Sequence, residues 1–256
     1  MTLYFKKDKL LLQDVEFANT TAEFFSTDSE EQFKRNSAKM SHDWKYHTEK
    51  IIYKWNSQGY RTKELDEIQK PFLLATGCSY TEGVGLNTKD IWASMVADNL
   101  GLDIYNIGKQ GSSPEVLTMN ALLWKANNLP KPDLVVAQWP NTMRKQFGFL
   151  EGNKIKFEDM SGTASQDGRW WKKRYIVDSG EMQKSVFQQI ETFNLVWESL
   201  GVPVINFTWE KIGVPLFSEI LEICPTAGNM EARDCQHDGI EFHRQTADEI
   251  LASYKV

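Results

Sequence analysis

The sequence predicts an α/β protein in which a parallel sheet carries helices on both faces. Two observations support this class. From residue 71 onward short apolar runs alternate with amphipathic stretches of helical length, and glycine or proline marks many of the junctions. Strands that alternate with helices pair in parallel, with the helices packed on the sheet. The chain has 256 residues, of which 41% are hydrophobic, so it is long and apolar enough to bury a core.

The predicted elements follow one another in a regular order. Residues 72–76 form an apolar run typical of a strand, and residues 91–100 are expected to form a helix that ends at Gly101. A strand at 104–106, a helix at 114–127 and a strand at 134–138 come next. After an interruption the order resumes with a helix at 185–200, a strand at 204–207 and a last helix at 242–254.

Two segments do not share this rhythm. Residues 1–70 are rich in charged and aromatic side chains with helical spacing around 20–33 and 43–55, which predicts an N-terminal helical extension packed on a core domain of residues 71–256. Residues 145–180 are interpreted as an insertion over the site. Alternation about Gly152-Asn153 predicts a hairpin, and the small polar stretch 161–168 predicts a mobile loop.

Charge and hydropathy exclude several classes of protein. The net charge of −6 argues against a general nucleic-acid binder, which usually carries a basic excess. No apolar run is long enough for a membrane span, and the first residues lack the basic-then-apolar order of a secretory signal. We therefore expect a cytoplasmic protein with neither nucleic-acid nor membrane partners.

The cysteine and histidine spacings favour neither a disulfide framework nor a metal site. The chain has 3 cysteines, at positions 78, 224 and 235, without the paired spacing of zinc ligands, which fits a reducing compartment. Cys78 and Cys235 flank candidate catalytic residues, so a redox link between them is an alternative to the favoured interpretation of two buried thiols. His42 and His47 lack the i, i+4 spacing of metal ligands, and no metal or cofactor is expected.

A candidate nucleophile follows the first core strand. The run ends in Gly77-Cys78-Ser79, a pattern that places a serine on a tight turn, and Asp234 and His237 lie three positions apart before the last helix. A serine hydroxyl needs a hydrogen-bonded base and an orienting acid to attack near neutral pH. Ser79 follows the first strand, and Asp234 and His237 lie in the last segment before the final helix, so these groups should meet at the carboxyl edge of the sheet. The alternatives are a helix-capping serine and a surface histidine.

Four separated blocks of residues 71–254 resemble those of the SGNH or GDSL hydrolases. Gly77-Cys78-Ser79 stands in the place of Gly-Asp-Ser, and Asn106 and Gly111 match the second block, Asn-x-x-x-x-Gly. Asn141 occupies the place of the third-block asparagine just past a strand. Asp234-Cys-Gln-His237 matches Asp-x-x-His, the last block.

The resemblance implies a flavodoxin-like three-layer α/β/α fold. It makes Ser79 the nucleophile, His237 the general base and acid, and Asp234 the group that orients the imidazole. The backbone amides of Ser79 and Gly111 and the side-chain amide of Asn141 would hold the oxyanion. No cofactor is implied.

The chain departs from the family pattern at two places. Cys78 replaces the usual aspartate, and Trp139-Pro140 replaces a glycine-rich lead into the third block. Some viral and bacterial relatives carry a tryptophan and an arginine there, as in Trp139 and Arg144, so Arg144 is expected to replace or supplement the third oxyanion donor. The stretch 56–61 also resembles the lead-in of SGNH-like proteins of bacteriophages.

The function indicated is that of a serine esterase or carbohydrate deacylase acting on a small or sugar-linked acyl group. One alternative is a catalytically inactive module that binds a glycan or a protein. Another is nucleotide binding at Gly83-Val-Gly85. Two neighbouring tryptophans, Trp170 and Trp171, precede a basic run, and form either a lid that contacts substrate or a packed corner of the insertion. Asp238 competes with Asp234 for the histidine, and His243 is interpreted as structural.

Overall fold

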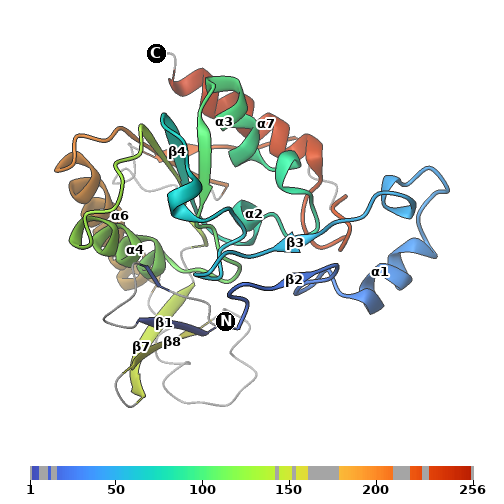
Figure 1. Ribbon diagram of the computed structural model, residues 1–256, viewed down its shortest axis with the longest axis horizontal. Helices are drawn as coiled ribbons and strands as arrows, with labels where there is room; N and C mark the ends of the chain where they lie inside the picture. The colour runs from blue at the N-terminus through green and yellow to red at the C-terminus, as the bar shows by residue number, and fades with distance from the viewer. Residues whose placement is uncertain are drawn as a thin grey trace.

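A five-stranded parallel sheet lies at the centre of the protein (Figure 1). The computed structural model describes residues 2–5, 11–12, 16–141, 144–151, 154–160, 179–209, 220–226 and 231–254. The strands follow the order β10-β9-β6-β4-β5, so β4, which precedes the candidate serine, is an inner strand. Their bounds are Phe72–Thr76 for β4, Asp103–Asn106 for β5, Leu134–Gln138 for β6, Val204–Thr208 for β9 and Ile220–Glu222 for β10.

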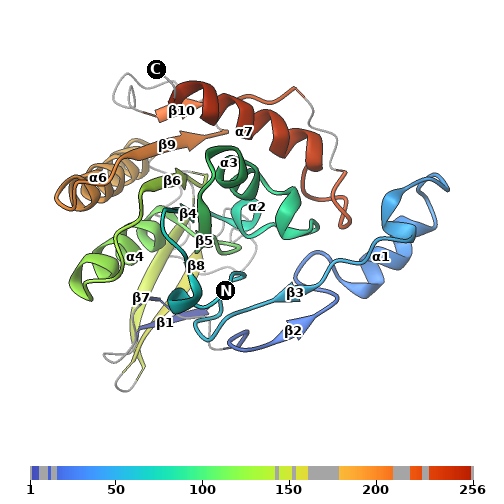
Figure 2. The ribbon, with the colours of Figure 1, turned by 45° about the horizontal axis from the view of Figure 1, so that its top comes forward.

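Helices cover both faces of this sheet (Figure 2). Helices α4 (Pro114–Ala126) and α6 (Ser179–Glu198) pack against each other on one face. Helices α3 (Trp92–Leu100) and α7 (Ile240–Tyr254) pack together on the other. The three-layer α/β/α fold with a parallel sheet is therefore confirmed.

The side chains of the inner strands alternate between the two cores. Leu74 and Val135 belong to the cluster beneath α4 and α6, whereas Leu73 and Val136 belong to the cluster beneath α3 and α7. Every residue of β4 and β6 is buried. A strand covered on both faces needs apolar side chains at successive positions, which is why these two strands read as unbroken apolar runs.

The strands and helices predicted between residues 71 and 254 are confirmed to within a few residues. The largest difference is at α6, which begins at Ser179 rather than at 185. The sequence did not predict β10, a three-residue strand that pairs in parallel with β9 at the edge of the sheet. A strand this short carries too few residues to show an alternation.

The N-terminal segment is less helical than predicted. The helices expected at 20–33 and 43–55 are wrong: the single α-helix of residues 16–70 is α1 (Glu30–Ser37), and a 3-10 turn occupies Lys45–His47. Strands β2 (Thr21–Ala22) and β3 (Tyr53–Lys54) pair antiparallel instead. A positive φ of 59° at Ser26 interrupts any helix through this region.

The predicted hairpin insertion is present. Strands β7 (Lys145–Glu151) and β8 (Lys154–Met160) pair antiparallel, and β1 (Thr2–Phe5) adds to the other side of β8. The turn at 152–153 and the stretch 161–178 lie outside the described residues. So do Trp170 and Trp171.

No helix in the described ranges is long and apolar enough to cross a membrane.

Candidate active site

Ser79 lies just past the inner strand β4, at the first position of the short helix α2 (Ser79–Glu82). The turn before it has room only for glycine, since a β-carbon on Gly77 would lie 2.2 Å from Thr81 Oγ1 and 2.8 Å from Gln138 Oε1. The Cys78 N–H donates to the same Gln138 oxygen at 2.9 Å. The side chain that ends β6 thus fixes the turn that ends β4.

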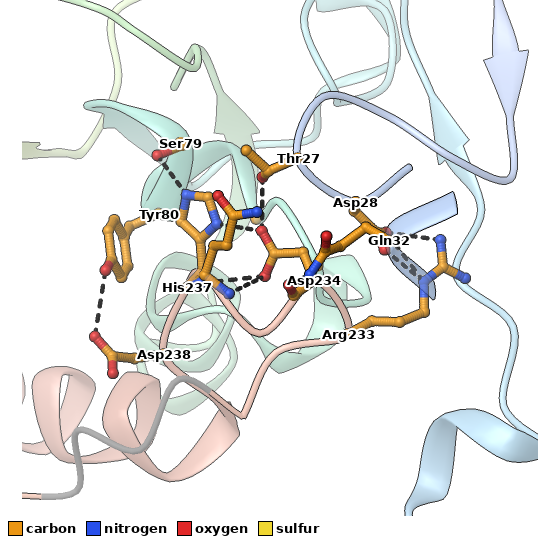
Figure 3. A network of polar contacts seen from close by, with 12 residues as sticks. Thr27, Asp28, Gln32, Ser79, Tyr80, Arg233, Asp234, His237 and Asp238 are labelled. Carbon is orange, nitrogen blue, oxygen red and sulfur yellow. Dashed lines mark hydrogen bonds and ion pairs between the residues drawn. The ribbon is translucent and has the colours of Figure 1, made fainter. Parts of the chain in front are cut away.

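His237 joins Ser79 to Asp234 (Figure 3). Its Nε2 lies 2.9 Å from Ser79 Oγ, and its Nδ1 lies 2.6 Å from Asp234 Oδ2. Both distances are hydrogen bonds, and they suit a tautomer in which Nδ1 carries the proton and Nε2 accepts from the serine. The structure therefore brings together three side chains that the sequence separates by up to 158 positions.

The Asp234 side chain is fully buried yet surrounded by donors. Its Oδ2 accepts from His237 and from the Thr27 hydroxyl at 2.6 Å, and its Oδ1 accepts the N–H groups of Gln236 and His237 at 3.1 Å. Burial alone would raise the pKa of the carboxyl. The hydrogen bond and charge of His237, with the hydrogen bonds from Thr27 and Gln236, instead hold that pKa below its ordinary value. The group is thus an anion at neutral pH.

Asp238 does not compete for the imidazole in this arrangement. It accepts a hydrogen bond from the Tyr80 hydroxyl at 3.3 Å. The Tyr80 ring packs edge-on against the His237 ring, with 5.0 Å between centroids. Tyr80 thus binds the acid that follows His237 in sequence, and its ring packs against one side of the imidazole.

The loop that carries the second block is tied to α2. Asn106 Nδ2 donates to the Thr81 carbonyl at 2.6 Å, and the Gln110 N–H donates to Glu82 Oε2 at 2.6 Å. Gly111 follows with φ +69°, a conformation that favours glycine. The Ser79 amide heads α2, where first-turn N–H groups lack an acceptor within the helix. Two of the predicted oxyanion donors therefore belong to segments that are bonded to each other.

A buried ion pair supports this loop from beneath. Lys109 Nζ lies 3.1 Å from Glu82 Oε1, and both side chains are fully buried. Three aromatic rings of the N-terminal segment surround the ammonium, with centroids 4.9 to 5.9 Å away. These rings belong to Phe17, Phe25 and Trp55, and the Trp55 indole N–H also donates to Glu82 Oε1 at 3.2 Å. The N-terminal segment thus helps to hold α2 and the Gly111 loop together.

The third block is only partly available to a substrate. Asn141 is exposed just past the end of β6, and its carbonyl accepts the Arg144 N–H at 2.9 Å. Trp139, predicted as a possible substrate contact, is 1% exposed, packs edge-on against Phe193 and donates its indole N–H to Asn206 at 2.9 Å. That prediction is wrong, because the side chain belongs to the core. Arg144 is half-buried, and its Nη1 has no hydrogen-bond partner among the described residues.

The glycines after α2 pack against the loop that carries the acid. Gly85 accepts the Arg233 N–H at 2.9 Å, and a β-carbon on Gly85 would lie 2.9 Å from Ala232 and 3.0 Å from Asp234 Oδ1. Gly83 and Gly85 both have positive φ. The space beside this turn is filled by protein, which argues against the nucleotide site considered from the sequence.

His243 has the structural role expected of it. It lies on α7, is 1% exposed, and its Nδ1 accepts the Trp92 N–H at 3.1 Å, so it caps the first turn of α3. Complete burial, with a smaller effect of the neighbouring His237 charge, lowers the pKa of His243 to about 3.

The cysteines and the other possible metal ligands near the site can be located among the described residues. Within them, no three His, Cys, Asp or Glu side chains are grouped as metal ligands. Cys78, Cys224 and Cys235 are free thiols, so Cys78 and Cys235 are not linked here.

Several residues that shape the site were missed from the sequence. Thr27 contacts Asp234 across 207 positions, and no motif marks it. Gln138 and the Glu82–Lys109 pair were also missed. Glu82 and Lys109 lie in small, polar and glycine-rich stretches of the sequence, so no local signal marks them as buried. Nothing in the sequence distinguishes Thr27 from other threonines.

The fold and the site together define a three-layer α/β/α protein with a serine, a histidine and an aspartate hydrogen-bonded in series at the carboxyl edge of its sheet. No protein-family model and no curated protein sequence matches the chain.

Among solved structures, the chain is similar to a carbohydrate esterase, to TesA, and to an acetyl xylan esterase from the rumen bacterium Butyrivibrio proteoclasticus. The identities are 11%, 14% and 15%, and the TM-scores 0.48, 0.44 and 0.45. The matches cover 73%, 72% and 73% of this chain, and 65%, 98% and 64% of the other chains. The chain therefore spans less than two thirds of the carbohydrate esterase and of the acetyl xylan esterase. All three TM-scores lie below 0.5, so the fold assignment rests on the sheet order and the helix layers described above.

Proposed function

We propose that the protein is a serine hydrolase that cleaves carboxylic esters through an acyl-enzyme. The observation that carries this proposal is the position of the His237 imidazole, 2.9 Å from Ser79 Oγ and 2.6 Å from Asp234 Oδ2. The four sequence blocks that resemble SGNH hydrolases favour the same reaction. The substrate class proposed is a small or carbohydrate-linked acyl ester.

In the first half of the reaction Ser79 becomes acylated. His237 Nε2 takes the hydroxyl proton while Oγ attacks the ester carbonyl, and the buried Asp234 carboxylate stabilises the imidazolium that forms. The tetrahedral intermediate collapses as the C–O bond to the alcohol breaks. The proton on Nε2 passes to the departing alkoxide, so the imidazole is neutral again.

In the second half water releases the acid. His237 takes a proton from a water molecule, which attacks the acyl carbon, and it returns the proton to Ser79 Oγ as the acyl bond breaks. In both halves, the negative charge that develops on the carbonyl oxygen is stabilised by hydrogen bonds from the backbone amides of Ser79 and Gly111. The side-chain amide of Asn141 is the third donor. A removed donor of this kind commonly costs about 3 to 4 kcal/mol of transition-state stabilisation.

The test is hydrolysis of p-nitrophenyl acetate by the parent protein and by Ser79→Ala. We expect kcat/KM to fall about 1,000-fold or more in the variant, since the nucleophile is lost. A fluorophosphonate probe should label the parent and not the variant. The far-ultraviolet circular dichroism should be unchanged.

Ser253→Ala is the matched control, because Ser253 is a half-buried serine of α7 that hydrogen-bonds only its own helix, at the Ile250 carbonyl. It should retain full activity and labelling. Equal hydrolysis by the parent and Ser79→Ala would refute the proposal. An unlabelled parent with measurable affinity for a glycan would support the inactive binding module instead.

A further inference from the structure

A tight turn of the N-terminal segment lies against the loop that carries Asp234 (Figure 3). The turn, residues 25–28, is closed by two backbone hydrogen bonds between Phe25 and Asp28, of 2.9 and 3.0 Å. Its two last residues contact two consecutive residues of the other loop. The Thr27 hydroxyl donates to Asp234 Oδ2 at 2.6 Å, and the Asp28 carboxylate pairs with the Arg233 guanidinium at 2.7 Å.

The turn is anchored independently of Thr27. On one side the Phe25 ring packs against Tyr53 and Trp55, with centroids 5.4 and 4.8 Å apart. On the other side the side chains of Asp28 and Arg233 are 0% and 4% exposed, and the Tyr53 hydroxyl donates to Asp28 Oδ2 at 2.5 Å. A buried pair with further hydrogen bonds is held in one geometry. The Thr27 hydroxyl is therefore presented to Asp234 by a fixed frame.

Helix α1 extends the same contact. Gln32 Nε2 donates to the Asp234 carbonyl at 3.3 Å, and Asn36 Nδ2 donates to the Arg233 carbonyl at 2.9 Å. The two side-chain amides are four residues apart, on one face of the helix, and they donate hydrogen bonds to the carbonyls of two consecutive residues. The backbone that carries the acid is thus positioned by α1, while its carboxylate is bonded by Thr27.

Thr27 differs from these neighbours in what it bonds. The other contacts hold backbone or the Arg233 side chain, and they would persist without a hydroxyl at position 27. The Thr27 hydroxyl bonds the same carboxylate oxygen that accepts from His237 Nδ1. It therefore fixes the orientation of the carboxylate plane and shares its negative charge with the imidazole.

We propose that Thr27 is a positioning residue for the triad, and that the turn 25–28 makes the N-terminal segment part of the active site. The inference rests on the proposed function. The hydrogen bond of the Thr27 side chain is to Asp234, so Thr27 acts on the serine and the histidine through that carboxylate.

The test compares Thr27→Val with Thr27→Ser and with Thr20→Val. Valine keeps the shape of threonine and removes the hydroxyl, whereas serine keeps the hydroxyl. Thr20 donates its hydroxyl to the Phe17 carbonyl at 2.7 Å within the same segment, so Thr20→Val removes a threonine hydroxyl whose hydrogen bond is to backbone rather than to the carboxylate.

The first readout is the carbon-13 signal of the Asp234 carboxyl, followed against pH by NMR. Loss of the Thr27 donor raises the pKa of Asp234 in Thr27→Val, since that hydrogen bond contributes to lowering it. Charged and titratable groups surround this carboxylate on three segments. Its own loop supplies Arg233, Cys235 and His237, the turn 25–28 supplies Asp28, and α2 supplies Tyr80. None of them is changed in the variants, so the parent titration should be kept in Thr27→Ser and Thr20→Val.

The second readout is ester hydrolysis against pH. In Thr27→Val we expect kcat to fall about tenfold with KM unchanged, because Thr27 acts on the orientation of His237 through Asp234 rather than on substrate binding. The pH profile should differ between Thr27→Val and the parent, since the carboxylate that orients the imidazole has lost a hydrogen bond. Thr27→Ser should remain within about twofold of the parent.

An Asp234 titration that is the same in Thr27→Val and the parent would overturn the inference, even if the variant were less stable. The NMR readout needs no turnover, so it decides the inference even in a protein without esterase activity. Loss of activity in Ser79→Ala with no change in Thr27→Val would leave the proposed function standing and refute the role of Thr27.

Discussion

Replacing His243 by asparagine should change how the stability of the protein depends on pH. His243 is 1% exposed and accepts the Trp92 N–H through Nδ1. An asparagine side-chain oxygen takes nearly the same place as Nδ1, so the cap of α3 is kept while the titratable group is removed. Comparing the parent with His243→Asn therefore measures how protonation of this one buried imidazole affects stability.

The magnitude follows from the gap between the folded and the ordinary pKa. Burial lowers the pKa of His243 from 6.5 to about 3. Between these values the unfolded chain binds a proton that the folded chain does not, so stability is complete above pH 6.5 and is lost as pH falls toward 3. At about 1.4 kcal/mol for each pH unit, the loss reaches about 3 kcal/mol near pH 4.5 and at most about 5 kcal/mol.

The assay is urea unfolding of the parent and of His243→Asn at neutral pH and at about pH 4.5. The parent should lose about 3 kcal/mol more of its free energy of unfolding than the variant over this interval. His42 is exposed, so His42→Asn should follow the parent. Equal losses in the parent and His243→Asn would refute the reasoning, because they would mean that His243 is protonated in the folded state.

Two further predictions concern the packing beneath the Gly111 loop. Glu82→Gln removes the negative charge that pairs with the fully buried Lys109 ammonium, so the free energy of unfolding measured in urea should fall by about 3 to 5 kcal/mol. Adding Lys109→Met should recover part of this loss, and a loss below about 1 kcal/mol in the single variant would contradict the prediction. A β-carbon on Gly108 would lie 2.6 Å from the Thr81 side chain and 2.8 Å from the Glu82 nitrogen, so Gly108→Ala should cost about 1 to 3 kcal/mol and slow p-nitrophenyl acetate hydrolysis. If Gly108→Ala has the stability and the hydrolysis rate of the parent, the loop can shift to accommodate a β-carbon at no cost, and the prediction is refuted.

The core of the fold was predictable because its local signals agree. Residues 72–75 and 134–137 are apolar throughout, and burial on both faces of a parallel sheet requires that pattern. The candidate site was predictable from position alone, since Ser79, Asp234 and His237 all follow strands or precede a helix at one edge of the sheet. Trp139 was misassigned because sequence cannot tell whether an aromatic side chain after a strand turns toward solvent or toward the core.

The N-terminal segment was not predictable for a different reason. Its aromatic residues recur at intervals that fit a helix, but Tyr53 and Trp55 lie on alternate positions of an extended chain and pack against Phe25 of the turn 25–28. Tertiary packing, rather than local preference, decides the conformation there. Thr27 could not be found from the sequence, because its importance comes from a partner 207 residues away.

The pairing of Asp28 with Arg233 also constrains when the site can form during synthesis. The two residues are 205 positions apart, and a ribosome adds about 5 to 20 residues each second, so the first partner waits on the order of 10 to 40 s for the second. During that interval the Asp28 carboxylate lacks the Arg233 guanidinium, and the Thr27 hydroxyl lacks the Asp234 carboxylate. The loop that carries Asp234 is made after all five strands of the central sheet, so the site is completed only once residue 237 has been added.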